Sequence, residues 1–220
     1  MTPRMFKDRD EAGRLLAGAL DFLKGRKDVI VLAIPRGGVP VAKLVADSLG
    51  APLDLVVTRK IGAPQEPELA VGAVTQDGEM IVDYELVGLL GISKAYLKRE
   101  SARQAREVEV RMRKYRGDRP YPSLAGKTVV IVDDGIATGS TVKAAILSVR
   151  ARKAAKVIVA APVGPADRVE ELSTMVDQVV CLSTPADFQA IGQFYEEFEQ
   201  VSDEVVWKMM TSETPAQGIP

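Results

Sequence analysis

The amino-acid sequence predicts an α/β protein whose core is a mostly parallel, twisted β-sheet flanked by helices. Two observations lead to this fold class. Short runs of β-branched and other apolar residues recur along the 220-residue chain, and segments with helical spacing of apolar residues separate most of them. Continuous apolar runs are typical of strands buried on both faces, and strands that alternate with helices form right-handed parallel crossovers.

Five apolar runs are expected to form the strands of this sheet. The predicted strands are residues 28–35, 53–57, 129–132, 156–164 and 176–183. Helical spacing of apolar residues predicts helices at residues 8–24, 39–50, 93–114, 141–152 and 165–174. Asp8 or Asp10 would cap the first helix, and Gly25 and Gly50 would end the first two. The apolar stripe on the long helix 93–114 could serve either the core or a subunit interface.

Residues 58–83 interrupt the alternation of strands and helices. We expect residues 58–69 to form a loop, because two prolines and a glycine disfavour regular structure there. The apolar runs 70–75 and 79–83 flank the turn sequence QDG, which predicts a β-hairpin.

The length suits a single domain that spans residues 1–210. Its core would occupy about residues 27–183, and the C-terminal segment, about residues 184–210, or the N-terminal segment, or both, would form a small hood. This hood is expected to consist of short helices, and residues 211–220 are expected to be a frayed tail. Phe188, Phe194 and Tyr195 could stack on a base or pack the hood.

The composition excludes several classes of site. The chain has no histidine, so a Ser-His-Asp triad, a Cys-His pair and a His-ligated zinc or iron site are all excluded. A metal ion, if one is used, should be a hard cation such as Mg²⁺. Cys181 is the one cysteine, so no internal disulfide can form, and its place on an apolar strand predicts a buried, inert thiol. No membrane-spanning apolar run and no secretory signal are found, which favours a cytoplasmic protein.

The net charge of −1 is unevenly distributed along the chain. Residues 93–119 hold ten Lys and Arg against four Asp and Glu, whereas residues 165–207 hold ten Asp and Glu against one Arg. Solvated helix faces would explain both segments. Alternatively, the two segments face each other, or the basic one meets an anion.

The sequence VVIVDDGIATGST, residues 129–141, carries the strongest functional signal. Asp133 and Asp134 would follow a buried strand at the edge of the sheet where open α/β proteins bind ligands, and they could accept hydrogen bonds from vicinal hydroxyls or hold a hydrated Mg²⁺. The small and hydroxyl residues of ATGST then lead into a helix N-terminus, which favours a phosphate. A ribose 5-phosphate offers both a diol and a phosphate. The simpler alternative is an Asp-Asp turn followed by an ordinary helix cap.

This stretch resembles, over all thirteen positions, the binding motif of the type I phosphoribosyltransferases for 5-phosphoribosyl 1-pyrophosphate (PRPP). The resemblance implies that Asp133 and Asp134 hold the 2- and 3-hydroxyls of the ribose. It implies that the 5-phosphate is wrapped by Ala137, Thr138, Gly139, Ser140 and Thr141. Some purine-salvage members carry an acidic residue at the position of Ala137, so a hypoxanthine-guanine specificity is not favoured here and the motif offers no obvious general base.

Two further segments are similar to the same family. PRGG, Pro35 to Gly38, stands where the family places its pyrophosphate loop, so Arg36, Gly37 and Gly38 are candidate pyrophosphate ligands and Arg36–Gly37 a candidate cis peptide. TRKIGAPQEPE, Thr58 to Glu68, resembles a loop of a poorly characterised branch called predicted phosphoribosyltransferases, in which Arg59 and Lys60 could close over the pyrophosphate. The matches cover roughly residues 29–183, and the C-terminal segment of that branch has a counterpart here.

The resemblance implies an enzyme that uses Mg²⁺ and PRPP to transfer the 5-phosphoribosyl group to a nucleobase or related nitrogen acceptor, with release of pyrophosphate. Asp133, Asp134 and Arg36 would be its catalytic residues, no protein side chain is a certain metal ligand, and relatives suggest a homodimer. The alternatives are a PRPP- or nucleotide-sensing regulator on the same fold, and hydrolysis or phosphorolysis of a sugar phosphate. The regulator could bind RNA through the basic helix, but a nucleic-acid partner is disfavoured because only Tyr96 and Tyr115 could stack on bases there. A dinucleotide-binding domain is disfavoured because no G-x-G-x-x-G follows a strand.

Overall fold

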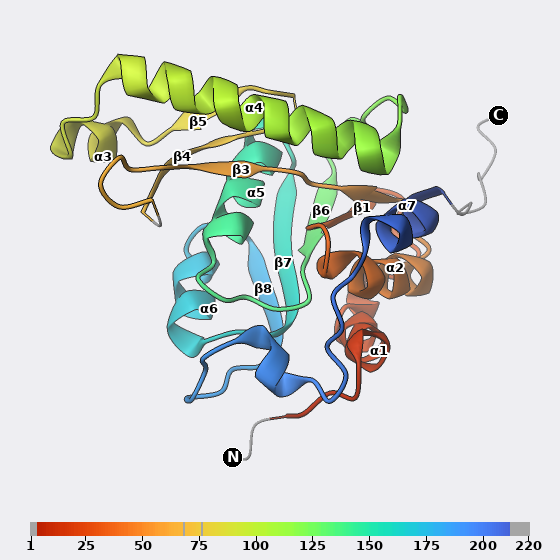
Figure 1. Ribbon diagram of the computed structural model, residues 1–220. Helices are drawn as coiled ribbons and strands as arrows, with labels where there is room; N and C mark the ends of the chain where they lie inside the picture. Colours follow the sequence, from red (N-terminus) through yellow and green to blue (C-terminus); the bar gives the residue numbers. More distant parts are fainter. Residues whose placement is uncertain (1–3, 68, 76, 212–220) are drawn as a thin grey trace.

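The computed structural model describes residues 4–67, 69–75 and 77–211, and its centre is a five-stranded parallel sheet (Figure 1). The strand order is β2-β1-β6-β7-β8, and every neighbouring pair is parallel. The strands are β1 (Val29–Ala33), β2 (Leu53–Leu55), β6 (Thr128–Val132), β7 (Lys156–Val163) and β8 (Gln178–Ser183). The predicted fold class and all five predicted strands are therefore confirmed.

Helices cover both faces of this sheet because successive strand residues point to opposite sides. Val31 packs with the residues of one helix pair, whereas its neighbour Leu32 packs with those of the other. The first pair is α1 (Arg9–Ala19) and α2 (Gly38–Leu49), and the second is α5 (Ser140–Ala151) and α6 (Ala166–Ser173). Asp8 caps α1 as predicted, but the helix ends at Ala19 and a short 3₁₀ helix, η1 (Asp21–Leu23), follows it.

A second, antiparallel sheet occupies the region where a loop was predicted. Its strands are β3 (Arg59–Gly62), β4 (Ala70–Val74) and β5 (Met80–Val82), in that order. The predicted hairpin is β4 and β5, whereas the expectation of a loop throughout residues 58–69 was wrong for β3. Ile61 is fully buried, and β3 gains pairing partners along β4, from Arg59 opposite Val74 to Gly62 opposite Ala70. The prolines lie beyond the strand, so they do not prevent it.

The long helix α4 (Lys94–Arg116) lies across the small sheet, and the short helix α3 (Tyr84–Leu89) precedes it (Figure 1). Ser93 caps α4, close to the predicted start. Leu97, Val108 and Tyr115 of its apolar stripe are buried in the main core cluster. The stripe therefore serves the core of this chain.

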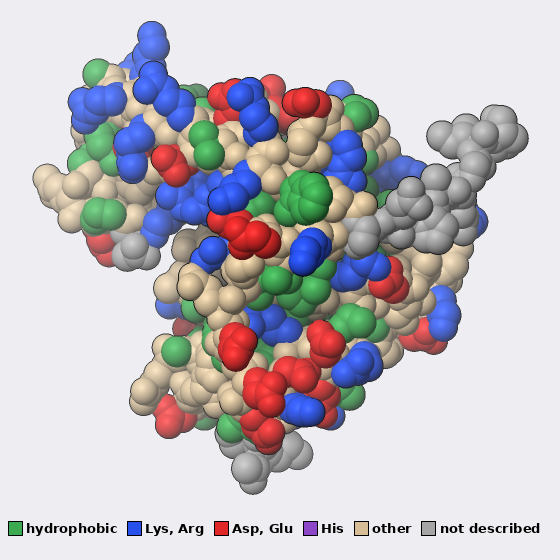
Figure 2. All heavy atoms as spheres, turned by 45° about the vertical axis from the view of Figure 1, so that its right-hand side comes forward, with side chains coloured by type: hydrophobic (Ala, Val, Ile, Leu, Met, Phe, Trp, Pro, Cys, Tyr) green, Lys and Arg blue, Asp and Glu red, His purple; other side chains and the backbone are tan. Residues whose placement is uncertain are grey.

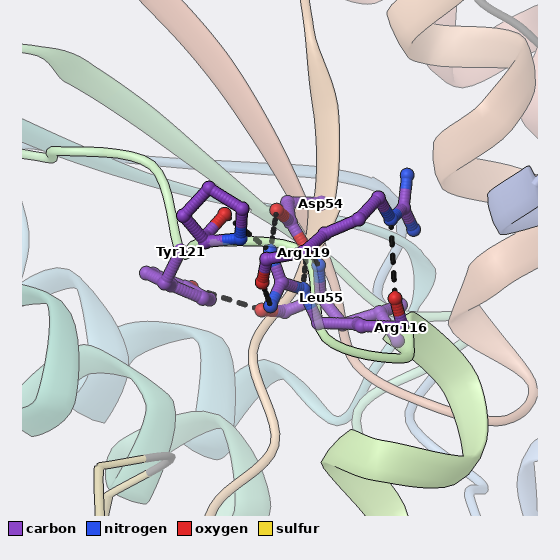
Figure 3. A network of polar contacts seen from close by, with 6 residues as sticks. Asp54, Leu55, Arg116, Arg119 and Tyr121 are labelled. Carbon is purple, nitrogen blue, oxygen red and sulfur yellow. Dashed lines mark hydrogen bonds and ion pairs between the residues drawn. The ribbon is translucent and has the colours of Figure 1, made fainter.

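A buried ion pair ties the end of α4 to the edge of the parallel sheet (Figure 3). Arg116 donates to both carboxylate oxygens of Asp54 in β2, with an Nη2 to Oδ2 distance of 2.7 Å. The same guanidinium donates to the carbonyl oxygens of Arg119 and Pro120, and the Tyr121 hydroxyl donates to the carbonyl oxygen of Leu55. These contacts fix the linker that returns the chain from α4 to β6.

The N-terminal and C-terminal segments pack together at the predicted hood. Phe6 bridges Tyr195, and the Phe6 amide donates to the carbonyl oxygen of Phe194 at 2.8 Å. The side chains of Phe6, Phe194 and Tyr195 form a small core with Val163 of β7. Two short helices belong to this segment, the 3₁₀ helix η2 (Ile191–Phe194) and α7 (Asp203–Thr211). Phe194 and Tyr195 thus pack the hood, and the predicted tail beyond Thr211 lies outside the described residues.

Candidate functional site

The acidic pair and the PRGG loop meet at the carboxyl edge of the parallel sheet. Asp133 and Asp134 follow β6, and Pro35 to Gly38 follow the neighbouring strand β1. The Ile34 amide donates to the carbonyl oxygen of Val132 at 2.9 Å, which extends the pairing of the two strands into the loops. Two segments about a hundred residues apart in sequence therefore form one site.

The two glycines of PRGG are required by the closeness of this contact. A Cβ atom on Gly37 would lie 2.0 Å from Oδ2 of Asp134, and one on Gly38 would lie 2.7 Å from the carbonyl oxygen of Val132. No side chain fits at either position. The backbone of the loop is thereby exposed to whatever the aspartates bind. The cis peptide precedes Arg36 rather than following it, since it joins Pro35 to Arg36, which corrects the predicted Arg36–Gly37 position.

Asp134 is held by two partners that were not expected from the sequence. Arg9, in the first turn of α1, donates through Nε to Oδ2 of Asp134 at 2.8 Å, and both side chains are largely buried. The Tyr195 hydroxyl donates to the Asp134 carbonyl oxygen at 2.7 Å. A cation in the first turn of a helix is disfavoured by the helix dipole, but this feature does not identify the partner of Arg9.

Asp133 faces a cavity of about 410 Å³ that Arg36, Gly37, Asp134 and Thr141 also line. Burial, together with the neighbouring charge of Asp134, raises the pKa of Asp133 well above its ordinary value. Its Oδ1 accepts a hydrogen bond from the Asp134 amide at 2.9 Å. A ligand hydroxyl or a cation in the cavity would therefore meet an acceptor that is held in place by the backbone.

The loop after the aspartates provides a helix N-terminus whose N-cap residue, Gly139, has no side chain to cap it, and the Ser140 amide makes a long hydrogen bond of 3.4 Å to Oγ1 of Thr138. Gly139 adopts a left-handed conformation with φ of 75° and immediately precedes α5. Ala137 and Thr138 are exposed, and the hydroxyls of Thr138 and Ser140 lie 2.8 Å apart. A further cavity, of about 740 Å³, opens beside Ala137, Thr138 and Ser140. Free amides at such a terminus are suited to a phosphate.

Arg36 points toward the C-terminal helix as well as the site. Its Nη1 lies 3.7 Å from Oδ1 of Asp203 in α7, and that carboxylate also accepts from Lys114 and Tyr115, both at 2.6 Å. Burial and the bond to Asp203 raise the pKa of Tyr115 to about 12. Asp203 was not predicted at the site, but it belongs to the acidic segment 165–207, and its ion pair with Lys114 is a contact of that segment with the basic segment 93–119.

Arg59 and Lys60 lie on β3, beside a neighbouring cavity of about 630 Å³. This cavity reaches Pro35 and Thr141, which also line the cavity of the aspartates. Of the predicted site residues, the structure thus brings Asp133, Asp134, Arg36, Gly37 and Thr141 together around one cavity, with Gly38 against the backbone of Val132 and Asp133. Ala137, Thr138 and Ser140 line a second cavity, and Arg59 and Lys60 line a third.

The carboxylates of the site suit a metal ion that is held chiefly by the bound substrate. Among the residues that the structure describes, no three His, Cys, Asp or Glu side chains gather as a metal site. Mg²⁺ commonly takes one or two carboxylates and completes its shell with water and substrate phosphates. Asp133 and Asp134 fit that requirement, since both line the same cavity as the glycine loop.

Comparison with known proteins assigns the family. The family model described as the phosphoribosyl transferase domain matches residues 7–198. The chain belongs to the phosphoribosyl transferase family. The match includes the acidic pair, the PRGG loop and the hood residues that contact Asp134.

Two known proteins are similar to most of this chain. A Mycobacterium tuberculosis H37Rv protein named "Putative phosphoribosyl transferase Rv0571c" is 47% identical over 203 residues, which are 92% of this chain and 46% of that protein. The chain therefore spans about half the length of this curated relative. The crystal structure of TT1426 from Thermus thermophilus is 43% identical, with a TM-score of 0.87 over 94% of this chain and 97% of that one.

In the part of the chain that the structure describes, none of the helices combines the length and the apolar character that a bilayer crossing requires.

Proposed function

We propose that this protein transfers the 5-phosphoribosyl group of PRPP, with Mg²⁺, to a nitrogen atom of a nucleobase or related acceptor and releases pyrophosphate. The observation that supports it most is the contact of Gly37 with the Asp134 carboxylate, since it joins a bare backbone loop to a carboxylate pair beside an uncapped helix N-terminus. Each of these three groups suits one part of PRPP. A cytoplasmic homodimer is part of the same proposal.

The binding roles follow from the chemistry of the groups. Asp133 and Asp134 would accept hydrogen bonds from the 2- and 3-hydroxyls of the ribose. The loop Ala137–Thr141 would bind the 5-phosphate through its amides and hydroxyls. Arg36 and the amides of Gly37 and Gly38 would bind the pyrophosphate, and Arg59 and Lys60 would approach it from the neighbouring cavity.

The proposed reaction is a displacement at C1 of the ribose. A lone pair on the acceptor nitrogen forms a bond to C1 while the bond from C1 to pyrophosphate breaks, and pyrophosphate leaves with the bonding electrons. The acceptor nitrogen then gives its proton to water. Arg36 would stabilise the charge on the leaving group, and Asp133 and Asp134 would orient the ribose as positive charge develops on it. Bound Mg²⁺ would neutralise pyrophosphate oxygens, with Asp133 or Asp134 holding it through water.

Phosphorus NMR tests this proposal directly. PRPP, Mg²⁺ and a small-molecule cell extract are incubated with the wild-type protein, with the Asp133→Asn/Asp134→Asn variant and with Asp47→Asn, a control on the exposed face of α2. We expect pyrophosphate to form with the wild type and the control and to be lost, by at least about 100-fold, in the double variant.

The other outcomes discriminate among the alternatives. Pyrophosphate that forms without extract indicates hydrolysis, and PRPP signals that broaden without conversion favour a sensor of PRPP. If PRPP neither binds nor reacts with the wild type, the proposed site is wrong.

A further inference from the structure

The cavity beside Arg59 forms a cationic cleft between α4 and β3, called here the α4–β3 cleft. Figure 2 shows that the molecule is hollowed below the part that carries α4, and that Lys and Arg side chains gather above this hollow. Among the described residues that line this cleft of about 630 Å³, Arg59, Arg103 and Arg111 carry guanidinium groups and Glu100 carries a carboxylate. The described lining therefore holds more guanidinium groups than carboxylates.

The carboxylate of Glu100 in this cleft is already engaged. Glu100 accepts from Arg103 at 2.6 Å and from the amide group of Gln104 at 2.8 Å. Gln104, buried in the cleft wall, accepts from Nε of Arg59 at 3.1 Å. In the residues that the structure covers, no salt bridge joins Arg111 to a carboxylate. Burial and the charges of Arg111 and Arg103 lower the pKa of Arg59, and the carboxylate of Glu107 opposes this shift.

A buried hydroxyl in the same cleft is an independent indication of a ligand. Thr58 is only 8% exposed and lines the cleft, and its Oγ1 has no hydrogen-bond partner among the described residues. Buried hydroxyls are normally hydrogen-bonded, so an unpaired one next to guanidinium groups indicates a bound polar group. Thr58 and Arg111 line the same cleft, so an oxyanion bound there has both groups as candidate donors.

We infer that the α4–β3 cleft binds an oxyanion of the second substrate, so that the acceptor of the phosphoribosyl group is an anion, with a carboxylate or phosphate, rather than a neutral base. This inference rests on the proposed function. The cleft adjoins the candidate ribose site through Pro35 and Thr141, so a ligand anchored by Arg111 can extend to that site. The diol, the 5-phosphate and the pyrophosphate have other candidate ligands, which leaves Thr58 and Arg111 for a further anion.

The first test measures anion binding in the cleft alone. Inorganic phosphate is titrated into protein with ¹³C-labelled threonine methyl groups, in the presence of saturating ribose 5-phosphate, and Thr58→Val assigns the Thr58 resonance. We expect this resonance to shift, and Arg111→Gln to weaken the phosphate affinity about tenfold, as expected for loss of a charge-assisted hydrogen bond. Arg113→Gln, on the exposed side of α4, removes the same charge and should change the affinity less than twofold. No shift, or equal affinities in both variants, overturns the inference.

The second test identifies which substrate carries the oxyanion. The cell extract is separated on an anion exchanger, and conversion of PRPP is followed with the retained and the unretained fractions. We expect conversion with the retained fraction, with an apparent KM about tenfold higher in Arg111→Gln and unchanged in Arg113→Gln. Conversion only with the unretained fraction overturns the inference.

Calorimetry of PRPP binding in the presence of Mg²⁺, by the wild type and by Arg111→Gln, separates the remaining outcomes. Equal PRPP affinity in Arg111→Gln and the wild type supports an acceptor site, whereas a tenfold loss would assign the cleft to pyrophosphate and overturn the inference. If no fraction supports conversion, the proposed transferase function fails, while the phosphate titration still decides whether the cleft binds an oxyanion.

Discussion

Gly37 lies so close to the Asp134 carboxylate that it determines how the two halves of the site join. Any side chain at residue 37 would clash with the Asp134 carboxylate and displace it from Arg9, which holds it at 2.8 Å. The glycine thus acts through its lack of a side chain. Its φ of −59° is accessible to any residue, so backbone conformation alone does not require glycine there.

Gly37→Ala tests this role. We expect the free energy of unfolding to fall by about 1–3 kcal/mol, since the added methyl group overpacks the contact. PRPP affinity should fall with it, because Asp134 must move. Urea denaturation and calorimetry measure the two effects. Gly18→Ala is the control, because no atom lies within 4 Å of its added Cβ on the exposed face of α1. It should stabilise the protein by about 0.5–1 kcal/mol; equal effects of the two changes would contradict the packing argument.

Cys181 is predicted to be an unreactive thiol at neutral pH. Its side chain is partly buried on β8, and burial raises its pKa to about 11, so the reactive thiolate is scarce until the pH approaches that value. Alkylation by iodoacetamide at pH 7.5, followed by mass spectrometry, should be much slower in the native protein than in urea. The native rate should rise steadily with pH up to about 11. A native rate like that of a free thiol would disprove the assignment.

At the scale of elements, a buried ion pair connects the small sheet and α4 to the parallel sheet. Asp54 interrupts the apolar run of β2, and a buried carboxylate in a strand needs a partner. Arg116 supplies that partner from the last turn of α4, 62 positions further along the chain. The pair therefore specifies where α4 ends against the sheet.

Arg116→Leu should destabilise the protein by about 3–5 kcal/mol, because it leaves Asp54 charged and unpaired in the interior. The double variant Asp54→Leu/Arg116→Met should recover most of this loss, since an apolar pair needs no compensation. Urea denaturation measures both. Arg113→Leu, exposed on the same helix, should change stability by less than about 0.5 kcal/mol. A single variant as stable as the wild type would show that the pair is not needed.

At the scale of the whole molecule, residues 6–9 of the N-terminal segment and residues 194–199 of the C-terminal segment lie together and support the site. Phe6 lies against Tyr195, whose hydroxyl binds the Asp134 carbonyl oxygen, and Arg9 of the N-terminal helix binds the Asp134 carboxylate. The N-terminal segment is therefore part of the hood, together with the C-terminal segment. Residues from both segments hold one aspartate.

Phe6→Ala is expected to cost about 3–5 kcal/mol of stability, because the ring is fully buried. Hydrogen exchange should increase over residues 190–200, since the Phe6 amide and carbonyl pair with that segment. Mass spectrometry of exchanged peptides measures this effect. Phe22→Ala removes a ring that is 54% exposed and should alter neither property appreciably. Unchanged exchange over residues 190–200 in Phe6→Ala would show that the hood holds together without the N-terminal segment.

Much of the framework could be predicted from the sequence. This part includes the five strands of the parallel sheet, its helices and the meeting of the acidic pair with PRGG. Apolar periodicity and the parallel topology are local or general properties, and together they bring Asp133 and Gly37 to one edge. Three features could not be predicted from the sequence. They are the strand β3, the partners Arg9 and Asp203, and the cleft that holds Arg59 beside Arg111. Each depends on a contact between segments far apart in the chain, and only tertiary packing selects the partner. Local residue preferences therefore determined the framework of the site, whereas long-range packing and charge decided which side chains complete it.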